Sequence, residues 1–381
     1  MPAPTPVLLM VRALGLGGTE RQVTETARGL DRSQFAPHVA CFVEDGLRKA
    51  EIEAAGVPIF RLPVTSFHKP SALTGAWQLA SLIRQHRIQL VHTFDAPMNM
   101  FGILPARLAG TPVVLSSQRA HRDLAGRGGR PVLRLMDHVV DGIVANCAAM
   151  SEHLTKDEHV PANRVYVCYN GIDTSVYHPA PVQRPQVLGN GVVIGVVCAL
   201  RPEKGLGTLI ESFATLAWES ASIKLAIVGS GPEEGALRAQ VAALGIVNNV
   251  HFEPATRDVA GWLRYMDIFV LPSLSEALSN SLMEAMACGC CPVASRVGGN
   301  PELVAHDVNG KLFEAANVTD LTAQLRPLIQ NEELRRRFAT ASAHRIATEF
   351  TQAAAAKRMG EIYEINLRRK ISDKRATFGA S

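Results

Sequence analysis

The sequence predicts an α/β protein with two Rossmann-like domains, each a parallel sheet covered by helices. Short apolar runs alternate with amphipathic stretches along nearly all 381 residues, and continuous apolar runs of this kind are typical of buried parallel strands. The alternation stops at residues 177–191, where three prolines and two glycines indicate a linker. The chain length also fits two or three domains of about 150 residues.

Strands are expected at the apolar runs and helices at the amphipathic stretches between them. The front-half strands are expected at residues 7–11, 38–43, 59–62, 90–93, 113–116 and 142–145, and the rear-half strands at 192–198, 224–228, 250–252, 268–271, 292–294 and 311–313. Helices are expected at residues 20–30, 73–85, 99–108, 206–218, 233–244, 259–265 and 281–288, with a long one near 351–369.

These elements predict a domain organisation. We expect a front domain over residues 1–180, a second domain over 190–350, a C-terminal helix over 351–370 and a frayed polar tail over 371–381. Ligands of parallel α/β sheets bind outside the carboxyl ends of the strands. Two facing domains of this type are therefore expected to hold a ligand in a cleft between them.

Composition excludes several classes of protein. Hydrophobic residues make up 47% and charged residues 19%, with a mean hydropathy of +0.08, which excludes disorder and a multi-span transporter. The net charge of +4 is not gathered into the basic stripe typical of nucleic-acid binders. Most of the seven cysteines lie in apolar runs, and the N-terminus lacks the features of a signal peptide. We therefore expect reduced, buried thiols and a cytoplasmic protein.

Two glycine-containing turns are candidates for phosphate binding. Gly17 and Gly18 stand between the first strand and the first helix, where glycines let the backbone approach an anion; a tight turn without a ligand explains them equally well. Gly229 and Gly231 form a G-x-G turn after a rear-half strand, and Glu253 ends the next strand. A dinucleotide fingerprint fails because the third glycine is displaced, which favours a turn near a ribose or base.

Charged side chains follow two other rear-half strands. Arg201 and Lys204 stand at a strand end and can converge on a diphosphate; a solvated basic turn is the alternative. Glu276 and Glu284 lie before and within a helix, where ionised carboxylates can accept hydrogen bonds from sugar hydroxyls. A capping box formed by Ser281 and Glu284 accounts for the second carboxylate equally well.

The segment that begins at Glu276 resembles the E-x7-E motif of the retaining GT-B glycosyltransferases of the large family-4 group. The family pattern is E-G-[FL]-[GPS]-N-x-x-x-E-A-M-A, and this chain has SEALSNSLMEAMACGCCPV, then SRVGGNPELV and VNGKLF. Four further features match in the family's order: Gly17 with Gly18, the NGID turn at 170–173, Arg201 with Lys204, and the GSGP turn at 229–232. The resemblance covers residues 7–370. It implies a GT-B fold whose C-terminal helix returns to the N-terminal domain.

The resemblance also implies residue roles. Arg201 and Lys204 would hold the diphosphate of a nucleotide-sugar donor, Glu284 its ribose, and Glu276 the hydroxyls of the transferred sugar. The leaving diphosphate would assist the acceptor on the same face, so that the anomeric configuration is retained without a protein nucleophile. The other residues implied to contact the donor are Gly17, Gly18, Gly229, Gly231, Glu253, Ser279, Asn280 and Ser281.

No D-x-D motif occurs in the sequence, so we expect no metal and no other cofactor. Cys288, Cys290 and Cys291 lack a second Cys/His pair at zinc-finger spacing, which favours packed thiols over a metal site.

The sequence departs from the family pattern in places. Ala277 replaces the glycine after the first glutamate, and the run that begins at Glu253 lacks the usual glycine-containing turn. No histidine directly follows the strand at 113–116. Arg119, His121 and His92 are the candidates for the group that steers the acceptor or the sugar phosphate.

The stretch from Arg119 to Arg134 contains five arginines and three glycines. A flexible, solvated loop is the interpretation that such a run of charges favours; a loop that meets an anionic lipid headgroup at a membrane surface is the alternative.

The sequence therefore predicts a retaining, metal-independent hexosyltransferase. It would use a UDP- or GDP-sugar and a glycan or lipid-linked acceptor, in cell-envelope polysaccharide or glycolipid synthesis, in the cytoplasm or at the inner face of the plasma membrane. The alternatives are an NAD(P)-dependent oxidoreductase that uses Gly229, Gly231 and Glu253, a nucleotide-sugar epimerase or a phosphorylase of the same fold, and a catalytically silent scaffold.

Overall fold

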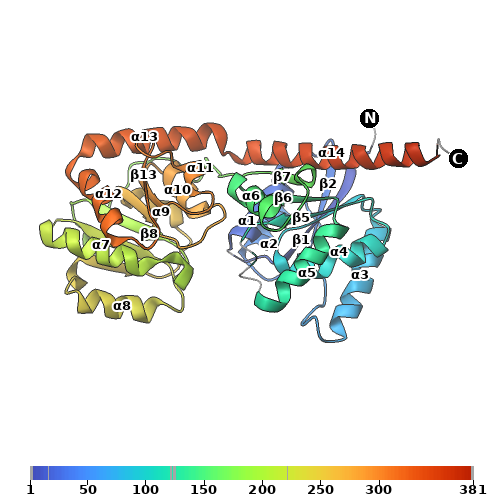
Figure 1. Cartoon of the computed structure of the whole chain (residues 1–381), viewed down its shortest axis with the longest axis horizontal. Coiled ribbons are helices and arrows are strands. Elements are labelled where there is room, and N and C mark those ends of the chain that lie inside the picture. Colours follow the sequence, from blue (N-terminus) through green and yellow to red (C-terminus); the bar gives the residue numbers. More distant parts are fainter. Residues whose placement is uncertain (1–2, 16, 121, 123–125, 221, 379–381) are drawn as a thin grey trace. The chain divides into compact units, whose positions relative to one another are not determined.

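The computed structural model describes residues 3–15, 17–120, 122, 126–220 and 222–378. These residues form two compact units (Figure 1): unit 1 runs to Gly171 and resumes at Gln352, and unit 2 spans Ile172–Thr351. Each unit contains one parallel sheet whose strands alternate with helices. The predicted pair of Rossmann-like domains is confirmed.

Unit 1 has a seven-stranded sheet in the order β3-β2-β1-β4-β5-β6-β7. Its strands are β1 (Thr5–Ala13), β2 (Phe35–Val43), β3 (Ile59–Arg61), β4 (Leu90–Thr93), β5 (Val113–Gln118), β6 (Gly142–Ala145) and β7 (Val165–Val167). Its helices are α1 (Gly18–Gly29), α2 (Leu47–Ala54), α3 (Ser71–Gln85), α4 (Ala96–Leu108), α5 (Gly126–Val139), α6 (Ala148–Lys156) and α14 (Gln352–Phe378).

Unit 2 has a six-stranded sheet in the order β10-β9-β8-β11-β12-β13. Its strands are β8 (Val193–Val197), β9 (Lys224–Val228), β10 (Val250–Glu253), β11 (Ile268–Leu271), β12 (Cys291–Ser295) and β13 (Lys311–Phe313). Its helices are α7 (Leu206–Glu219), α8 (Glu234–Ala243), α9 (Val259–Tyr265), α10 (Asn280–Ala287), α11 (Asn300–Leu303), α12 (Val318–Gln330) and α13 (Glu332–Glu349).

The C-terminal helix α14 belongs to the core of unit 1. Met359, Ile362 and Tyr363 recur at helical spacing, are almost fully buried, and join the cluster that contains Leu9 of β1 and Val23 of α1. Burying each such apolar side chain contributes about 1.5–3 kcal/mol. This apolar stripe explains why the end of the chain packs back on its beginning, as the GT-B resemblance implies.

Two predictions about local structure are wrong. Residues 371–378 continue α14 rather than forming a frayed tail, and much of the arginine-rich stretch forms helix α5 rather than a loop.

All seven cysteines are free thiols, and all but Cys198 are buried. In the described part of the chain, no helix is long and apolar enough to span a bilayer.

Each sheet contains one point at which the strand order reverses. In unit 1 this point lies between β1 and β4, and in unit 2 it lies between β8 and β11. The chain diverges to opposite sides from such a pair of strands, which leaves a crevice outside their carboxyl ends where ligands bind in open α/β sheets. The loops that follow these four strands are therefore the first places to search for a site.

Substitution of Gly229 probes the close backbone packing behind the unit 2 crevice. A Cβ at this residue would lie 1.9 Å from the Cys198 carbonyl oxygen, and its φ of +144° disfavours L-side chains. We expect G229A to destabilise unit 2 by about 1–3 kcal/mol in thermal unfolding. The matched control is G235A in α8, where a Cβ would meet no atom within 4 Å and the change should stay within about 1 kcal/mol. Equal melting temperatures for the two variants would contradict this account.

Candidate functional site

An ion pair joins the loops that follow β8 and β11 in unit 2. Lys204 Nζ donates to Glu276 Oε1 at 2.5 Å, and Ser273 Oγ donates to the same oxygen at 2.8 Å. The two charged side chains retain 22% and 11% exposure, respectively, so both can still meet a ligand. The structure thus brings together a cation and a carboxylate that lie 72 positions apart in the sequence.

Backbone contacts hold these two loops in place. The Leu274 amide donates to the Glu203 carbonyl at 2.8 Å. A Cβ at Gly205, whose φ is +61°, would lie 2.3 Å from the Pro272 carbonyl oxygen. A Cβ at Gly298, whose φ is +50°, would lie 1.9 Å from the Glu276 carbonyl oxygen. Only glycine permits both approaches, so the position of Glu276 depends on backbone packing as well as on its ion pair.

Helix α10 begins next to this ion pair. Ser279 is its N-cap, and Ser279 Oγ accepts a hydrogen bond from the Leu282 amide at 3.3 Å. The capping box of Ser281 with Glu284 is therefore the wrong explanation, since the helix starts two residues earlier than that box requires. Asn280 and Ser281 lie in the first turn, where helix amides and the helix dipole favour an anion. Glu284 is 4% exposed.

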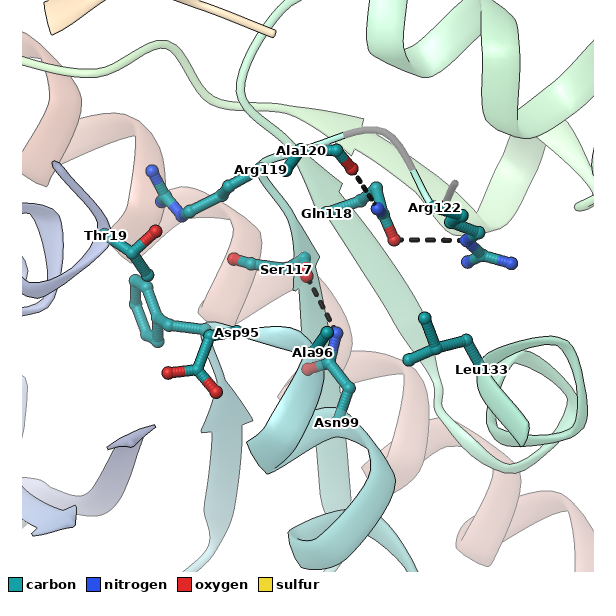
Figure 2. Close-up of a pocket in the computed structure, with 11 residues that line it drawn as sticks. Thr19, Asp95, Ala96, Asn99, Ser117, Gln118, Arg119, Ala120, Arg122 and Leu133 are labelled. Carbon is teal, nitrogen blue, oxygen red and sulfur yellow. Dashed lines mark hydrogen bonds between the residues drawn. The ribbon is translucent and has the colours of Figure 1, made fainter. Parts of the chain in front are cut away.

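A pocket of about 150 Å³ lies at the crevice of unit 1 (Figure 2). It is lined by Thr19 of α1, by the loop and helix that follow β4, including Asp95 and Asn99, and by the end of β5 with Arg119 beyond it. Asp95 caps α4 and accepts from the Met98 amide at 2.9 Å.

Arg119 is anchored at one nitrogen. Its Nη1 donates to Asn170 Oδ1 at 2.7 Å, and its guanidinium carbon lies 5.1 Å from the centre of the Phe94 ring.

Comparisons with known proteins assign the family. The Glycosyltransferase Family 4 model matches residues 16–176, and the model described as Glycosyl transferases group 1 matches residues 183–345. The chain is a group 1 glycosyltransferase. The first model falls mainly in unit 1 and the second in unit 2. The predicted family and enzyme class are confirmed.

The glycosyltransferase is similar to several curated and solved proteins. It is 26% identical to a D-inositol 3-phosphate glycosyltransferase of Thermobispora bispora, over 78% of this chain and 76% of the relative. It is 25% identical to an N-acetyl-alpha-D-glucosaminyl L-malate synthase of Bacillus anthracis, over 78% and 80%. Among solved structures, Anabaena Alr3699/HepE in complex with UDP and glucose superposes with a TM-score of 0.81 at 20% identity, covering 94% of this chain and 99% of that one. This last likeness supports the GT-B fold.

Other predicted donor residues of the glycosyltransferase make other polar contacts or have packing roles. The Arg201 side chain is 62% exposed and lies 3.8 Å from Glu203. A Cβ at Gly231 would lie 2.3 Å from the Leu200 carbonyl oxygen, so close packing already accounts for this glycine, as it does for Gly229. Glu253 lies 3.2 Å from His251. The donor-binding roles of these residues stay predictions.

The front-half glycines also have a local explanation. Gly17 is the N-cap of α1, and Gly18 is its first residue. A Cβ at Gly17 would lie 2.1 Å from a carboxylate oxygen of Glu20. An acidic side chain therefore stands where the phosphate-loop prediction places an anion, and the predicted role of this turn stays untested.

The three candidates for the steering residue have different outcomes. His92 is fully buried, and its ring nitrogens lie 2.8 Å from the Tyr363 hydroxyl and 2.9 Å from Ser117 Oγ. The hypothesis that His92 steers a ligand is therefore wrong, because it is a core residue. His121 lies outside the described residues. Arg119 lines the unit 1 pocket.

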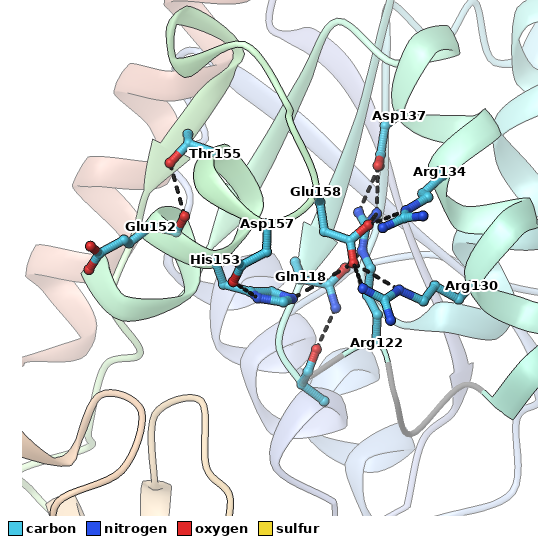
Figure 3. A network of polar contacts seen from close by, with 11 residues as sticks. Gln118, Arg122, Arg130, Arg134, Asp137, Glu152, His153, Thr155, Asp157 and Glu158 are labelled. Atoms are coloured by element: carbon cyan, nitrogen blue, oxygen red, sulfur yellow. Dashed lines mark hydrogen bonds and ion pairs between the residues drawn. The ribbon is translucent and has the colours of Figure 1, made fainter.

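The arginine-rich stretch forms a network of internal ion pairs (Figure 3). Arg122 is 2% exposed and bonds both oxygens of Asp137, at 2.6 and 2.9 Å. Arg130 Nε and Arg134 Nε donate to the fully buried carboxylate of Glu158, at 3.0 and 2.5 Å. The interpretation of this stretch as an anion-binding loop fails for these three arginines, because carboxylates of the protein already pair with them. The side chain of Arg127 is not described.

Sequence reasoning missed several residues of the site. Ser273 and Gly298 position Glu276, and Asp95 and Asn99 line the unit 1 pocket. Ser273 and Asp95 each stand two residues after a strand, which is a signal that a search of strand ends detects. The role of Gly298 has no local signal, since its contact lies 22 residues away in the sequence. Among the described residues, no three His, Cys, Asp or Glu side chains gather as a metal site.

His92 makes stability depend on pH. Burial, together with the charge of Arg119, lowers the pKa of His92 well below its usual value. The folded state therefore binds fewer protons than the unfolded state at this residue, whose unfolded pKa is about 6.5. Its contribution is complete above that pH and falls by up to about 1.4 kcal/mol per pH unit below it. In urea unfolding, we expect the stability advantage of the wild type over H92Q to shrink between pH 7 and pH 5. A constant difference would contradict this account.

Proposed function

We propose that this glycosyltransferase transfers a hexose from a UDP- or GDP-sugar to a glycan or lipid-linked acceptor with retention of configuration. The observation that carries the proposal is the Lys204–Glu276 ion pair, which lies at the strand-order reversal of unit 2 beside the N-terminus of α10. That place combines a cation and helix amides, which suit a diphosphate, with a carboxylate, which suits sugar hydroxyls.

In this proposal, each charged group of the site binds a different part of the nucleotide sugar. Lys204 carries three N–H donors, one of which binds Glu276, so the others can reach phosphate oxygens. The first turn of α10 stabilises negative charge that develops on the leaving diphosphate. Glu276 holds the transferred sugar, Glu284 the ribose, and Arg201 at the same strand end supplies a second cation. Because these groups stabilise the leaving group electrostatically, transfer needs no metal.

The choice of nucleotide draws on similar proteins. HepE has been solved with UDP-glucose, and a Mycobacterium tuberculosis relative, 28% identical over 71% of this chain, is a GDP-mannose-dependent mannosyltransferase. A thermal-shift panel of UDP, GDP and ADP with their sugars identifies the donor class, since a ligand specific to the folded state raises the melting temperature.

The oxidoreductase alternative has no support from the family or its relatives, and packing accounts for the glycines on which it depends.

The two members of the ion pair should affect different parts of the donor. K204Q removes a charged contact to the diphosphate, so we expect calorimetry to show binding of the stabilising nucleoside diphosphate weakened about 10- to 100-fold. E276Q should keep the affinity for the nucleoside diphosphate within about threefold of the wild-type value. It removes a contact to the sugar, which that ligand lacks, and it breaks the ion pair of Lys204 without removing the cation. It should instead lower turnover of the intact nucleotide sugar by about 10²-fold or more.

Two exposed residues serve as controls for the change in charge: K357Q on α14 and E333Q on α13. Both should match the wild type in binding and turnover. The proposal fails if K204Q binds the nucleoside diphosphate as tightly as K357Q does.

Activity after exhaustive chelation should equal that of the untreated enzyme, because the proposed transfer needs no metal. A loss of activity that a divalent ion restores would contradict metal independence.

A further inference from the structure

Arg119 lies against a buried cluster of groups that are uncharged near neutral pH. Burial and the Arg119 charge lower the pKa of His92, and burial raises the pKa of Cys168 to about 11 and that of Tyr363 well above its usual value. Asn170, which accepts from Arg119 Nη1, is neutral, and so is the ring of Phe94. The described groups packed against this guanidinium therefore offer it no counter-ion.

The guanidinium also has unused hydrogen-bonding capacity. Within the described part of the chain, Arg119 forms no ion pair, and its buried Nε has no hydrogen-bond acceptor. Burial lowers the pKa of Arg119 to about 10, which leaves it charged at neutral pH. A half-buried cation without a counter-ion costs free energy, and its unpaired, buried Nε donor adds to that cost.

Neighbouring arginines show that this fold can supply partners. Arg122 is paired with Asp137, and Arg130 and Arg134 are paired with Glu158, although the last two are more exposed than Arg122. Arg119 differs from them because it lines the unit 1 pocket at the crevice beyond β1 and β4.

Asp95 is the acidic residue among the described residues that line this pocket, and its carboxylate is occupied elsewhere. Asp95 accepts from the Arg12 amide at 2.7 Å and from the Met98 amide at 2.9 Å. Figure 2 shows the Asp95 carboxylate pointing away from the Arg119 guanidinium, while the Thr19 hydroxyl lies on the same side as that guanidinium. Burial raises the pKa of Asp95 above its usual value, although both amide hydrogen bonds oppose that rise.

The size of the pocket limits what it can hold. A volume of about 150 Å³ corresponds to several water molecules and is smaller than a typical ligand site of about 300–1,000 Å³. It suits one small polar group of a larger molecule. A guanidinium with free donors beside a hydroxyl selects a planar or tetrahedral oxyanion.

We propose that the unit 1 pocket binds an anionic group, a phosphate or a carboxylate, that belongs to the acceptor, and that Arg119 is the residue that holds it. This inference rests on the proposed function for the distinction between donor and acceptor. The anion site itself follows from unit 1 alone. It means that the acceptor carries a negatively charged group.

The test uses anions and needs no turnover. The full-length R201Q/K204Q variant lacks the cations proposed to hold the donor. Its melting temperature is measured at constant ionic strength as inorganic phosphate is added. Acetate is added in a separate titration as the carboxylate probe. We expect a saturable rise that R119Q abolishes and R119K reduces. R84Q, which removes an exposed arginine of α3, is the matched control and should keep the full rise. A rise that survives R119Q, or no rise at all, overturns the proposal.

Two further measurements separate the possible explanations. If Arg119 were a structural residue, R119Q would lower the melting temperature without any anion; we expect it to stay the same or to increase, because an unpaired charge is removed. In the wild type saturated with the stabilising nucleoside diphosphate, the phosphate effect that depends on Arg119 should persist. Its loss would assign the site to the donor and overturn the acceptor assignment. Failure of the proposed function itself would instead appear as unchanged nucleotide binding in K204Q.

Discussion

The reversal of strand order is the constraint on which both candidate sites depend. In unit 2 it places the loops after β8 and β11 side by side, and only that adjacency lets Lys204 reach Glu276. In unit 1 it opens the crevice beyond β1 and β4, where the pocket with Arg119 lies. The chemistry is carried by loops, but the two sheets decide which loops meet.

The two sites differ in how their charges are balanced. In unit 2 the cation of Lys204 is neutralised by Glu276, a carboxylate of the same protein, with which the proposed diphosphate would compete. In unit 1 the described residues leave Arg119 without a carboxylate partner and surround it with neutral groups. Under the proposed function, the first arrangement would meet two parts of a donor, whereas the second favours any ligand that brings a negative charge.

The sequence predicts the fold well because strands and helices are local patterns. Strands β6, β9, β11 and β13 begin and end where the apolar runs do, and Glu276 and Lys204 are recognised from their motif. The errors involve long-range contacts. The arginine-rich stretch is predicted to be a loop because composition cannot identify the partners of its arginines. Glu158 pairs with Arg130 and Arg134 of helix α5, and Asp137 of the same helix pairs with Arg122. Nothing in the sequence around His92 indicates that this residue packs in the core against Tyr363, which lies 271 positions away.

In the proposed function, the donor diphosphate binds between Lys204 and the first turn of α10. Hydrogen exchange of the unmodified enzyme, followed by mass spectrometry with and without the nucleoside diphosphate that raises its melting temperature, tests this most directly. We expect slower exchange in peptides that cover residues 201–206 and 276–284. Protection confined to other segments, such as residues 229–235, with no change at these two, would contradict it.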